Sequence, residues 1–377
     1  MAQLEPTITE RRRQTRNSIY QLIYHAKRPI SKLEITQALH LSMPTVQLNT
    51  GELLEAGLID VGEIKRSTGG RRPMGYEVKR DCKLAIGAAI SADHLRFILC
   101  DMKLEELHKR SLLHDCDADP DLPGFFLREL GRFVRDYCPD PSKILGVGLT
   151  IPGIYDEKTD SVVISPTMRM KDISLRTIVE GSDLPVYIVN DSTGAGAAEL
   201  ATLPPNRQGD FVYLMLENGI GGYIYLNHQV YEGANGRSAE FGHMRIVPGG
   251  RKCNCGQNGC LEAYCSALRF SRDLGMTTEA FFAKLDQKDP ACTKLWEDVL
   301  DHLALGIINI RMAFDCDIVL GGFVAEHMDK WIEPLREKVA ALDPFSATAD
   351  YVRLSANAEA GMRGAAWHFI GQFIEAI

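Results

Sequence analysis

Four residues able to bind a metal ion lie close together between positions 243 and 260. Cys253, Cys255 and Cys260 fall within eight residues of a glycine-bearing loop, and His243 precedes them. Three sulfurs and one nitrogen form a closed tetrahedral set that leaves no position for water, which favours a structural zinc ion over a catalytic one. The alternative is that they are unrelated thiols in a loop. The spacing therefore predicts a segment folded around Zn²⁺.

The seven other cysteines show no comparable spacing, and we interpret them as small core hydrophobes or surface thiols. The N-terminus has no apolar stretch of signal-peptide length, and the chain has no run of about 18 apolar residues. We therefore expect a cytoplasmic protein without a membrane partner. Disulfides are rare in that compartment.

The N-terminal 60 residues predict three helices. The first covers residues 8–26, the second residues 31–40 after a Ser31 cap, and the third about residues 43–56 after a Ser42 cap. The spacing of the second and third helices fits a helix-turn-helix, in which the later helix enters the major groove of DNA.

The third helix has an outward N-terminal face that could contact DNA. Pro44, Thr45, Gln47 and Leu48 lie on it, and Thr45 and Gln47 can donate or accept hydrogen bonds at bases or phosphates. The positions expected to point inward are Val46, Leu53 and Leu54. Gly51 costs this helix about 1 kcal/mol relative to alanine, and a close helix contact is the one explanation that the sequence offers.

Two short strands, at residues 61–64 and 76–78, flank a glycine-rich basic loop with Arg71 and Arg72, as in the wing of a winged helix. Arginine is favoured in narrow, A/T-rich minor grooves. Residues 1–80 hold 13 Lys/Arg and 8 Asp/Glu, whereas the rest of the chain holds 29 and 42. This asymmetry is expected when only the N-terminal part meets phosphate. A solvated basic helix and a protein-binding winged helix are the alternatives.

Apolar strand-like runs alternate with helical stretches from Lys83 onward, which predicts an α/β body. Glycine and polar turns follow many of these runs, and ligands usually bind at such strand ends. The predicted strands cover residues 84–90, 95–101, 144–150, 186–189, 211–216 and 318–320.

Several segments, in order along the body, resemble the motifs of the ROK family (repressors, open reading frames, kinases). The Glu-Phe-Gly-His-Met segment at 240–244 and the Cys-x-Cys-Gly-x-x-Gly-Cys-Leu-Glu segment at 253–262 resemble the family signature. The Ser-Thr-Gly-Gly-Arg-Arg-Pro segment at 67–73 resembles the wing of the repressor branch. Further resemblances lie at Gly146–Gly153, Val189–Asp191, Gly219–Gly222 and Val319–Gly322.

The resemblance implies a winged helix-turn-helix at residues 1–80, followed by a two-lobed, actin-like sugar-kinase (ribonuclease H-like) α/β fold with a zinc-binding loop. The N-terminal lobe would cover residues 81–195 and the C-terminal lobe residues 196–377, with the option that the last helix packs on the first lobe. It also implies that sugar hydroxyls are bound between the lobes. The residues implied for that site are Gly153, Asn190, Asp191, Glu240, His243 and Glu262.

The motifs that hold ATP phosphates in the family depart from the family pattern here. Ala89 stands where the kinase motif has an aspartate, and Ser91 replaces its first glycine. Alanine cannot organise a magnesium ion, and serine hinders close approach of the backbone to a phosphate. Glu217 would place a negative charge beside the phosphates. Asp191 matches the catalytic base, and without a phosphate donor we expect it to accept a hydrogen bond from a sugar hydroxyl.

These features together predict a sugar-responsive DNA-binding transcription regulator, a repressor of carbohydrate-metabolism genes, rather than an enzyme. The expected partners are operator DNA, a sugar or sugar phosphate, and further copies of the chain in a homodimer or homotetramer. One alternative is an ATP-dependent sugar kinase that carries a DNA-binding head. Another is a zinc-stabilised scaffold that binds neither ligand.

Overall fold

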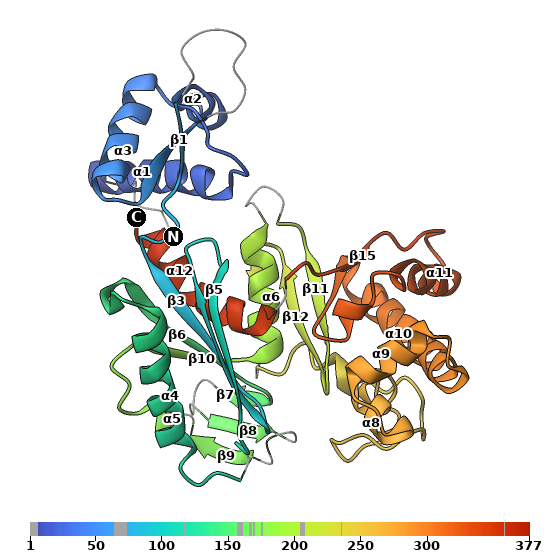
Figure 1. Ribbon diagram of the computed structural model, residues 1–377. Helices are drawn as coiled ribbons and strands as arrows, with labels where there is room; N and C mark the ends of the chain where they lie inside the picture. The colour runs from blue at the N-terminus through green and yellow to red at the C-terminus, as the bar shows by residue number, and fades with distance from the viewer. Residues whose placement is uncertain are drawn as a thin grey trace.

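The computed structural model describes residues 7–63, 74–116, 118–156, 161–165, 168, 170–174, 176–203, 208–234, 236–357 and 359–377. The N-terminal part of the described chain, residues 7–63 and 74–80, is called the head below, and there it contains three helices and a two-stranded antiparallel sheet (Figure 1). Its elements are α1 (Ile8–His25), α2 (Lys32–Leu39), α3 (Met43–Glu55), β1 (Ile59–Glu63) and β2 (Met74–Val78).

Each predicted helix of the head begins at a hydroxyl cap. Thr7, Ser31 and Ser42 accept a hydrogen bond from the backbone N–H three residues later, which satisfies donors that the first helical turn leaves unpaired. Val46 and Leu53 of α3 are buried as predicted, and Leu54 is half-buried. The core they join also contains Ile19, Tyr20, Ile23, Ile35 and Ile59.

The first lobe is built on a five-stranded mixed sheet of order β10-β6-β3-β4-β5. These strands are β3 (Leu84–Ile90), β4 (His94–Cys100), β5 (Glu106–Leu113), β6 (Ile144–Ile151) and β10 (Val186–Asn190). Strand β3 is buried at every residue because both faces of the sheet are covered. Ile86, Ala88 and Ile90 join the core beneath α4 (Leu122–Tyr137), whereas Ala85 and Ala89 join the core beneath α12 (Ala360–Ala376).

Short elements complete the first lobe. A separate antiparallel sheet consists of β7 (Ile154–Asp156), β8 (Ser161–Ser165) and β9 (Met170–Ser174). Helix α5 covers Arg176–Val179, and a 3-10 turn covers Pro141–Lys143.

The second lobe has a five-stranded sheet of order β13-β12-β11-β14-β15. Helix α6 (Asp191–Thr202) packs on one face, and α10 (Pro290–Phe314) helps to form the large core on the other face. The strands are β11 (Phe211–Leu216), β12 (Ile220–Leu226), β13 (Gln229–Val230), β14 (Asp317–Gly321) and β15 (Val352–Leu354). The remaining helices are α7 (Glu262–Cys265), α8 (Leu268–Leu274), α9 (Thr278–Asp286) and α11 (Ile332–Leu342), with 3-10 turns at Phe241–His243 and Ala325–His327.

Helix α12 returns from the second lobe to pack on the first-lobe sheet, and its C-terminal end lies beside the head (Figure 1). Glycines allow this close packing. A Cβ on Gly364 would lie 1.6 Å from the Gly194 carbonyl oxygen of α6, and one on Gly148 would lie 2.1 Å from the Ala365 carbonyl. Helix α12 therefore contacts both α6 and β6 backbone to backbone.

The six strands predicted for the body occur as β3, β4, β6, β10, β11 and β14, and the α/β class is confirmed. Strand β5 was not predicted, because its edge position leaves most of its side chains exposed and its sequence lacks an apolar run. Among the residues described, no helix combines the length and the apolar character that crossing a membrane requires.

Candidate functional site

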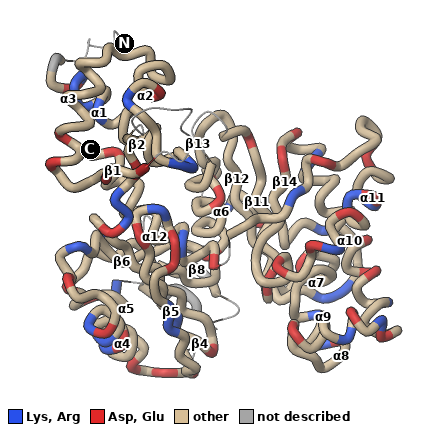
Figure 2. The backbone as a smooth tube through the Cα atoms, turned by 45° about the horizontal axis from the view of Figure 1, so that its top comes forward, with Lys and Arg blue, Asp and Glu red and all other residues tan. Residues whose placement is uncertain are grey.

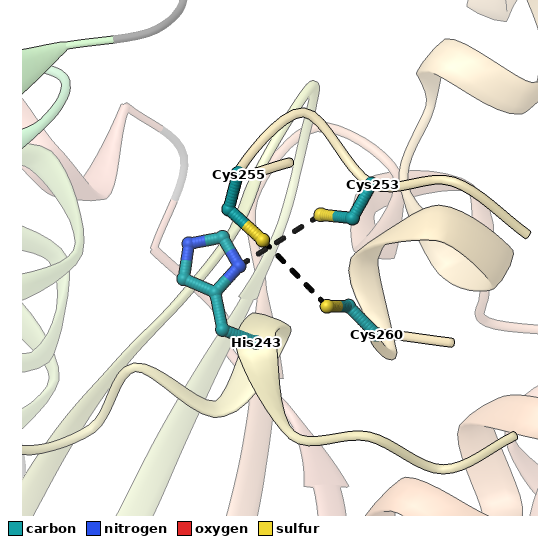
Figure 3. A group of neighbouring side chains, drawn as sticks. All are labelled: His243, Cys253, Cys255 and Cys260. Atoms are coloured by element: carbon teal, nitrogen blue, oxygen red, sulfur yellow. Dashed lines mark hydrogen bonds between the residues drawn. The ribbon is translucent and has the colours of Figure 1, made fainter. Parts of the chain in front are cut away.

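The structure brings His243, Cys253, Cys255 and Cys260 together, with one ligand atom from each within 4.8 Å of the others. Figure 3 shows the four side chains pointing toward a common centre. The Sγ atoms of Cys255 and Cys260 are 3.7 Å apart, and His243 Nδ1 lies 3.9 Å from Cys253 Sγ. Ligands of a tetrahedral zinc ion with 2.3 Å bonds lie about 3.8 Å apart. The set therefore has the spacing that a metal ion of this kind requires.

His243 connects this group to a set of acidic residues. Its Nδ1 faces the cysteines, and its Nε2 lies 3.8 Å from a carboxylate oxygen of Glu240. Glu262 also lies next to the group, since its Oε1 is 3.6 Å from Cys253 Sγ. Its Oε2 accepts a hydrogen bond from the Ile220 amide at 3.1 Å. A metal ion at the cysteines would fix the ring of His243 and leave Nε2 available on the acidic side.

Asn190 and Asp191 lie where β10 ends and α6 begins. The Asn190 side chain caps α6 by accepting from the Ser192 amide, and its Nδ2 donates to the Gly153 carbonyl. Gly153 has φ +131°, a conformation that L side chains rarely adopt. Asn190 thus ties the start of α6 to the turn after β6.

The acidic residues Asp191, Glu240 and Glu262 lie close enough to influence one another. Burial raises the pKa of Asp191 to about 6, although two backbone N–H groups and Arg96 oppose the shift. Burial also raises the pKa of Glu240; nearby His243 lowers it, and the negative charges of Asp191 and Glu262 raise it further. Clustered, partly desolvated carboxyls are suited to bind a ligand with several hydroxyl groups.

The region of the expected phosphate motifs contains an arginine that the sequence analysis did not single out. Ala89 of β3 pairs with Arg96 of β4, and Arg96 forms an ion pair of 3.1 Å with Glu359 at the start of α12. Lys109 of β5 also pairs with Glu359. Ser91 lies in the β3–β4 turn, where its amide donates to the His94 carbonyl. No local pattern marks these pairs, because their members lie far apart in sequence.

Glu217 differs from expectation in its charge. Burial raises its pKa to about 8, and the negative charges of Asp191 and Glu359 add to the shift, whereas Arg96 opposes it. The raised pKa of this carboxyl favours its protonated form and runs against the negative charge expected at this position. Desolvation outweighs the single nearby arginine.

Of the residues expected to contact DNA, Pro44 and Gln47 are exposed on α3 and Thr45 is half-buried. All three lie in the first half of the helix, and none is among its buried residues. Arg71 and Arg72 lie outside the described residues.

A family model described as the ROK family matches residues 85–372. A protein named putative xylose repressor, from Caldicellulosiruptor sp. (strain Rt8B.4), is 28% identical over 335 residues, which is 83% of this chain and 84% of that protein. A protein named glucokinase, from Halalkalibacterium halodurans, is 26% identical over 263 residues, which is 63% of this chain and 80% of that protein.

Among solved structures, a crystal structure of a ROK family transcriptional regulator, described as a homolog of the E. coli MLC protein, superimposes with a TM-score of 0.74. The match is 21% identical and covers 97% of each chain. It therefore extends over the head as well as over both lobes.

Proposed function

Because the chain belongs to the ROK family, we propose that it is a sugar-responsive DNA-binding transcription regulator that represses carbohydrate-metabolism genes. The observation that carries this proposal is the presence of the N-terminal head in addition to the two lobes. The sequence similarity to the glucokinase covers 63% of the chain, whereas that to the putative xylose repressor covers 83%, and the structural match to the transcriptional regulator covers 97%. A three-helix unit with a two-stranded sheet is the arrangement of a winged helix-turn-helix, which binds operator DNA.

In this proposal residues 1–80 bind DNA, and residues 81–195 and 196–377 form the two lobes that hold the effector. Recognition of DNA involves Pro44, Thr45 and Gln47 of α3 and Arg71 and Arg72 of the wing. Winged helices commonly act as dimers on half-sites about one DNA turn apart, or multiples of it. We therefore expect a homodimer or homotetramer on a roughly palindromic operator with an A/T-rich component.

The effector is a sugar or sugar phosphate. Its hydroxyls are held by Asp191, Glu240, His243 and Glu262, while Asn190 and the Gly153 turn shape the same site. The proximity of these groups supports this role, since carboxylates and amides bind adjacent hydroxyls in paired geometry. Zn²⁺ bound by His243 and the three cysteines is structural and orients the imidazole toward the sugar.

The chain lacks kinase activity in this proposal. Ala89 has no carboxylate for magnesium, and its strand neighbour Arg96 is engaged by Glu359. A protonated Glu217 would not repel a phosphate, so this residue argues against phosphate binding through its bulk rather than its charge. Asp191, at the position of the kinase base, is the observation that favours the kinase alternative. A coupled ATP-consumption assay with a panel of sugars distinguishes the two functions.

The contacts of α12 provide a route between sugar and DNA. Asn190 caps α6, α6 packs backbone to backbone on α12, and α12 ends against the head. Arg16 of α1 donates to the Ile377 carbonyl at 2.7 Å and lies 3.5 Å from Glu52 of α3. A sugar that changes the angle between the lobes would therefore act on α3 through α12 and α1.

A thermal-shift screen with free and phosphorylated sugars, followed by titration of operator binding with each stabilising sugar, tests the proposal. We expect a sugar that raises the melting temperature also to change operator affinity by about 5–150-fold. Asp191→Asn should lose both responses, whereas Asp183→Asn, at an exposed loop residue, should keep them. Operator affinity that stays flat for every stabilising sugar would refute the regulatory mechanism.

A further inference from the structure

A groove on the head lies between the N-terminal half of α1 and the first half of α3. Its α3 side includes two of the residues expected to contact DNA, Pro44 and Thr45. Its α1 side is basic, because Arg11 and Arg12 lie there, and Figure 2 shows basic residues along α1. The lining consists of Arg11, Arg12, Thr15, Pro44, Thr45, Leu48 and Asn49. The groove is thus continuous with the proposed DNA-binding surface.

Both arginines of this groove are exposed, and Arg12 is held toward α3. Arg12 forms an ion pair with Glu52, one turn beyond Leu48 on α3, and its side chain is still 57% exposed. Arg16 also lies within 3.5 Å of Glu52, so one carboxylate orients two guanidinium groups. A guanidinium has five N–H donors, and a single carboxylate leaves some of them free to meet an anion.

The same groove contains a solvent-exposed apolar side chain, that of Leu48. Leu48 is 53% exposed in the middle of α3. An exposed leucine contributes little to a solvated helix, but an apolar side chain can contact the C5-methyl group of thymine in the major groove. Leu48 lies one turn after Thr45, and the two residues therefore share one face of the helix.

The dimensions of DNA connect these observations. The major groove is about 12 Å wide, and an α-helix with its side chains is about 10–12 Å across. A helix that enters the groove consequently has phosphates along its flanks, and residues beside the helix meet them.

We infer that the groove between α1 and α3 is a DNA-backbone site: Arg11 and Arg12 bind phosphates that flank the major groove, while Leu48 contacts a thymine methyl inside it. This inference rests on the proposed function, that the head binds operator DNA. To that function it adds phosphate contacts from α1, which lies outside the helix-turn-helix, and an apolar base contact from Leu48.

The phosphate contacts are tested by the salt dependence of binding. The probe is a duplex that the wild-type, full-length protein selects from a random-sequence library. Each phosphate contact contributes about 0.9 to the slope of log K against log salt concentration. Arg11→Ala with Arg12→Ala should therefore lower the slope by about 1.8, which makes the affinity loss between 50 and 200 mM salt about 12-fold smaller. Arg13→Ala is the matched control, because Arg13 is exposed on α1 and does not line the groove.

The base contact is tested by replacing thymine with deoxyuridine, which lacks only the methyl group, at one position of the selected duplex at a time. Burial of one methyl group corresponds to about fourfold in affinity. At one or two positions the wild-type protein should lose about this factor, whereas Leu48→Ala should bind both duplexes equally.

Circular dichroism and melting curves establish that each variant is folded. The inference is overturned if the double arginine variant keeps the wild-type slope, if Arg13→Ala lowers the slope as much, or if Leu48→Ala loses the same factor as wild type on every deoxyuridine duplex. The first of these results would be expected if the groove bound an acidic peptide. If the wild-type protein selects no duplex, the proposed function fails as well, so the two failures are distinguishable.

Discussion

Individual carboxyl groups of this protein differ in charge because they differ in their surroundings. Glu34 on α2 accepts hydrogen bonds from the Arg28 side chain and from the Ser31 amide, and these lower its pKa to about 2. Glu217 lies among buried groups with Asp191 and Glu359 nearby, and its pKa rises to about 8. The Glu34 shift depends on residues within six positions of it, whereas the Glu217 shift depends on residues that the fold brings together, for which the sequence contains no local signal.

The protonation of Glu217 predicts how stability depends on pH. The carboxyl ionises near pH 4.5 in the unfolded chain and near pH 8 in the folded protein. Between these values the folded state holds a proton that the unfolded state has released, so stability falls as pH rises through this window. Glu217→Gln removes this penalty. The melting temperature of the variant relative to wild type should rise from pH 5 to pH 8 and then level off; a difference that is constant with pH would contradict the assignment.

Gly51 also has a consequence at the scale of one residue. A close helix contact does not explain it, because a Cβ built at this position meets no atom within 4 Å. Gly51→Ala should therefore stabilise the head by up to about 1 kcal/mol, through helix propensity alone. Slower hydrogen exchange of the α3 amides measures this gain. Exchange that is unchanged or faster would mean that the added methyl group disturbs α3.

At the scale of elements, the loop with the four candidate metal ligands is a segment whose shape we expect to depend on a bound ion. Cys253 and Cys260 are buried and Cys255 is exposed, and the three thiols lie together with the His243 imidazole. We expect about one zinc ion per chain in the wild-type protein, from the four-ligand set. Cys255→Ser should bind much less than one, and its loop amides should exchange faster.

The control for this prediction is Cys82→Ser, which changes a half-buried thiol far from the loop. It should retain zinc and loop protection. Zinc content of the purified proteins, measured by mass spectrometry, and hydrogen exchange of residues 253–260 provide the readouts. A Cys255→Ser protein with full zinc content would show that the other three ligands suffice.

The elements differ in how far sequence predicts them. The caps Ser31 and Ser42 and the apolar run of β3 are local signals, and the helices and strands they predict occur. The metal group was also predictable, since its cysteines lie within eight residues. The pairing of Arg96 with Glu359 was not, because 263 residues separate them and only the β3–β4 register and the return of α12 bring them together.

At the scale of the whole molecule, α12 joins the parts that the proposed function must couple. It packs on the first-lobe sheet and on α6, and it contacts α1 of the head. Asn17 donates to the Ile374 carbonyl and Arg16 to the Ile377 carbonyl. Tyr24 of α1 adds a ring contact with Trp367 of α12. The head is therefore attached to the body by directed hydrogen bonds in addition to a hydrophobic core that it shares with the first lobe and α12, and a change in α12 can alter both.

These contacts predict that sugar binding and sugar response are separable. Arg16→Ala with Asn17→Ala removes the hydrogen bonds from α1 to α12 and leaves the residues of the sugar site in place. The sugar should still raise the melting temperature of the body, whereas its effect on operator affinity should shrink from about 5–150-fold to less than about twofold. Ser18→Ala, at an exposed residue of the same helix, should respond as wild type does.

Linkage requires that operator DNA also cease to change the sugar affinity of the double variant. Isothermal titration of sugar with and without operator measures this directly, and an undiminished response would show that the coupling reaches the head by a path other than α12.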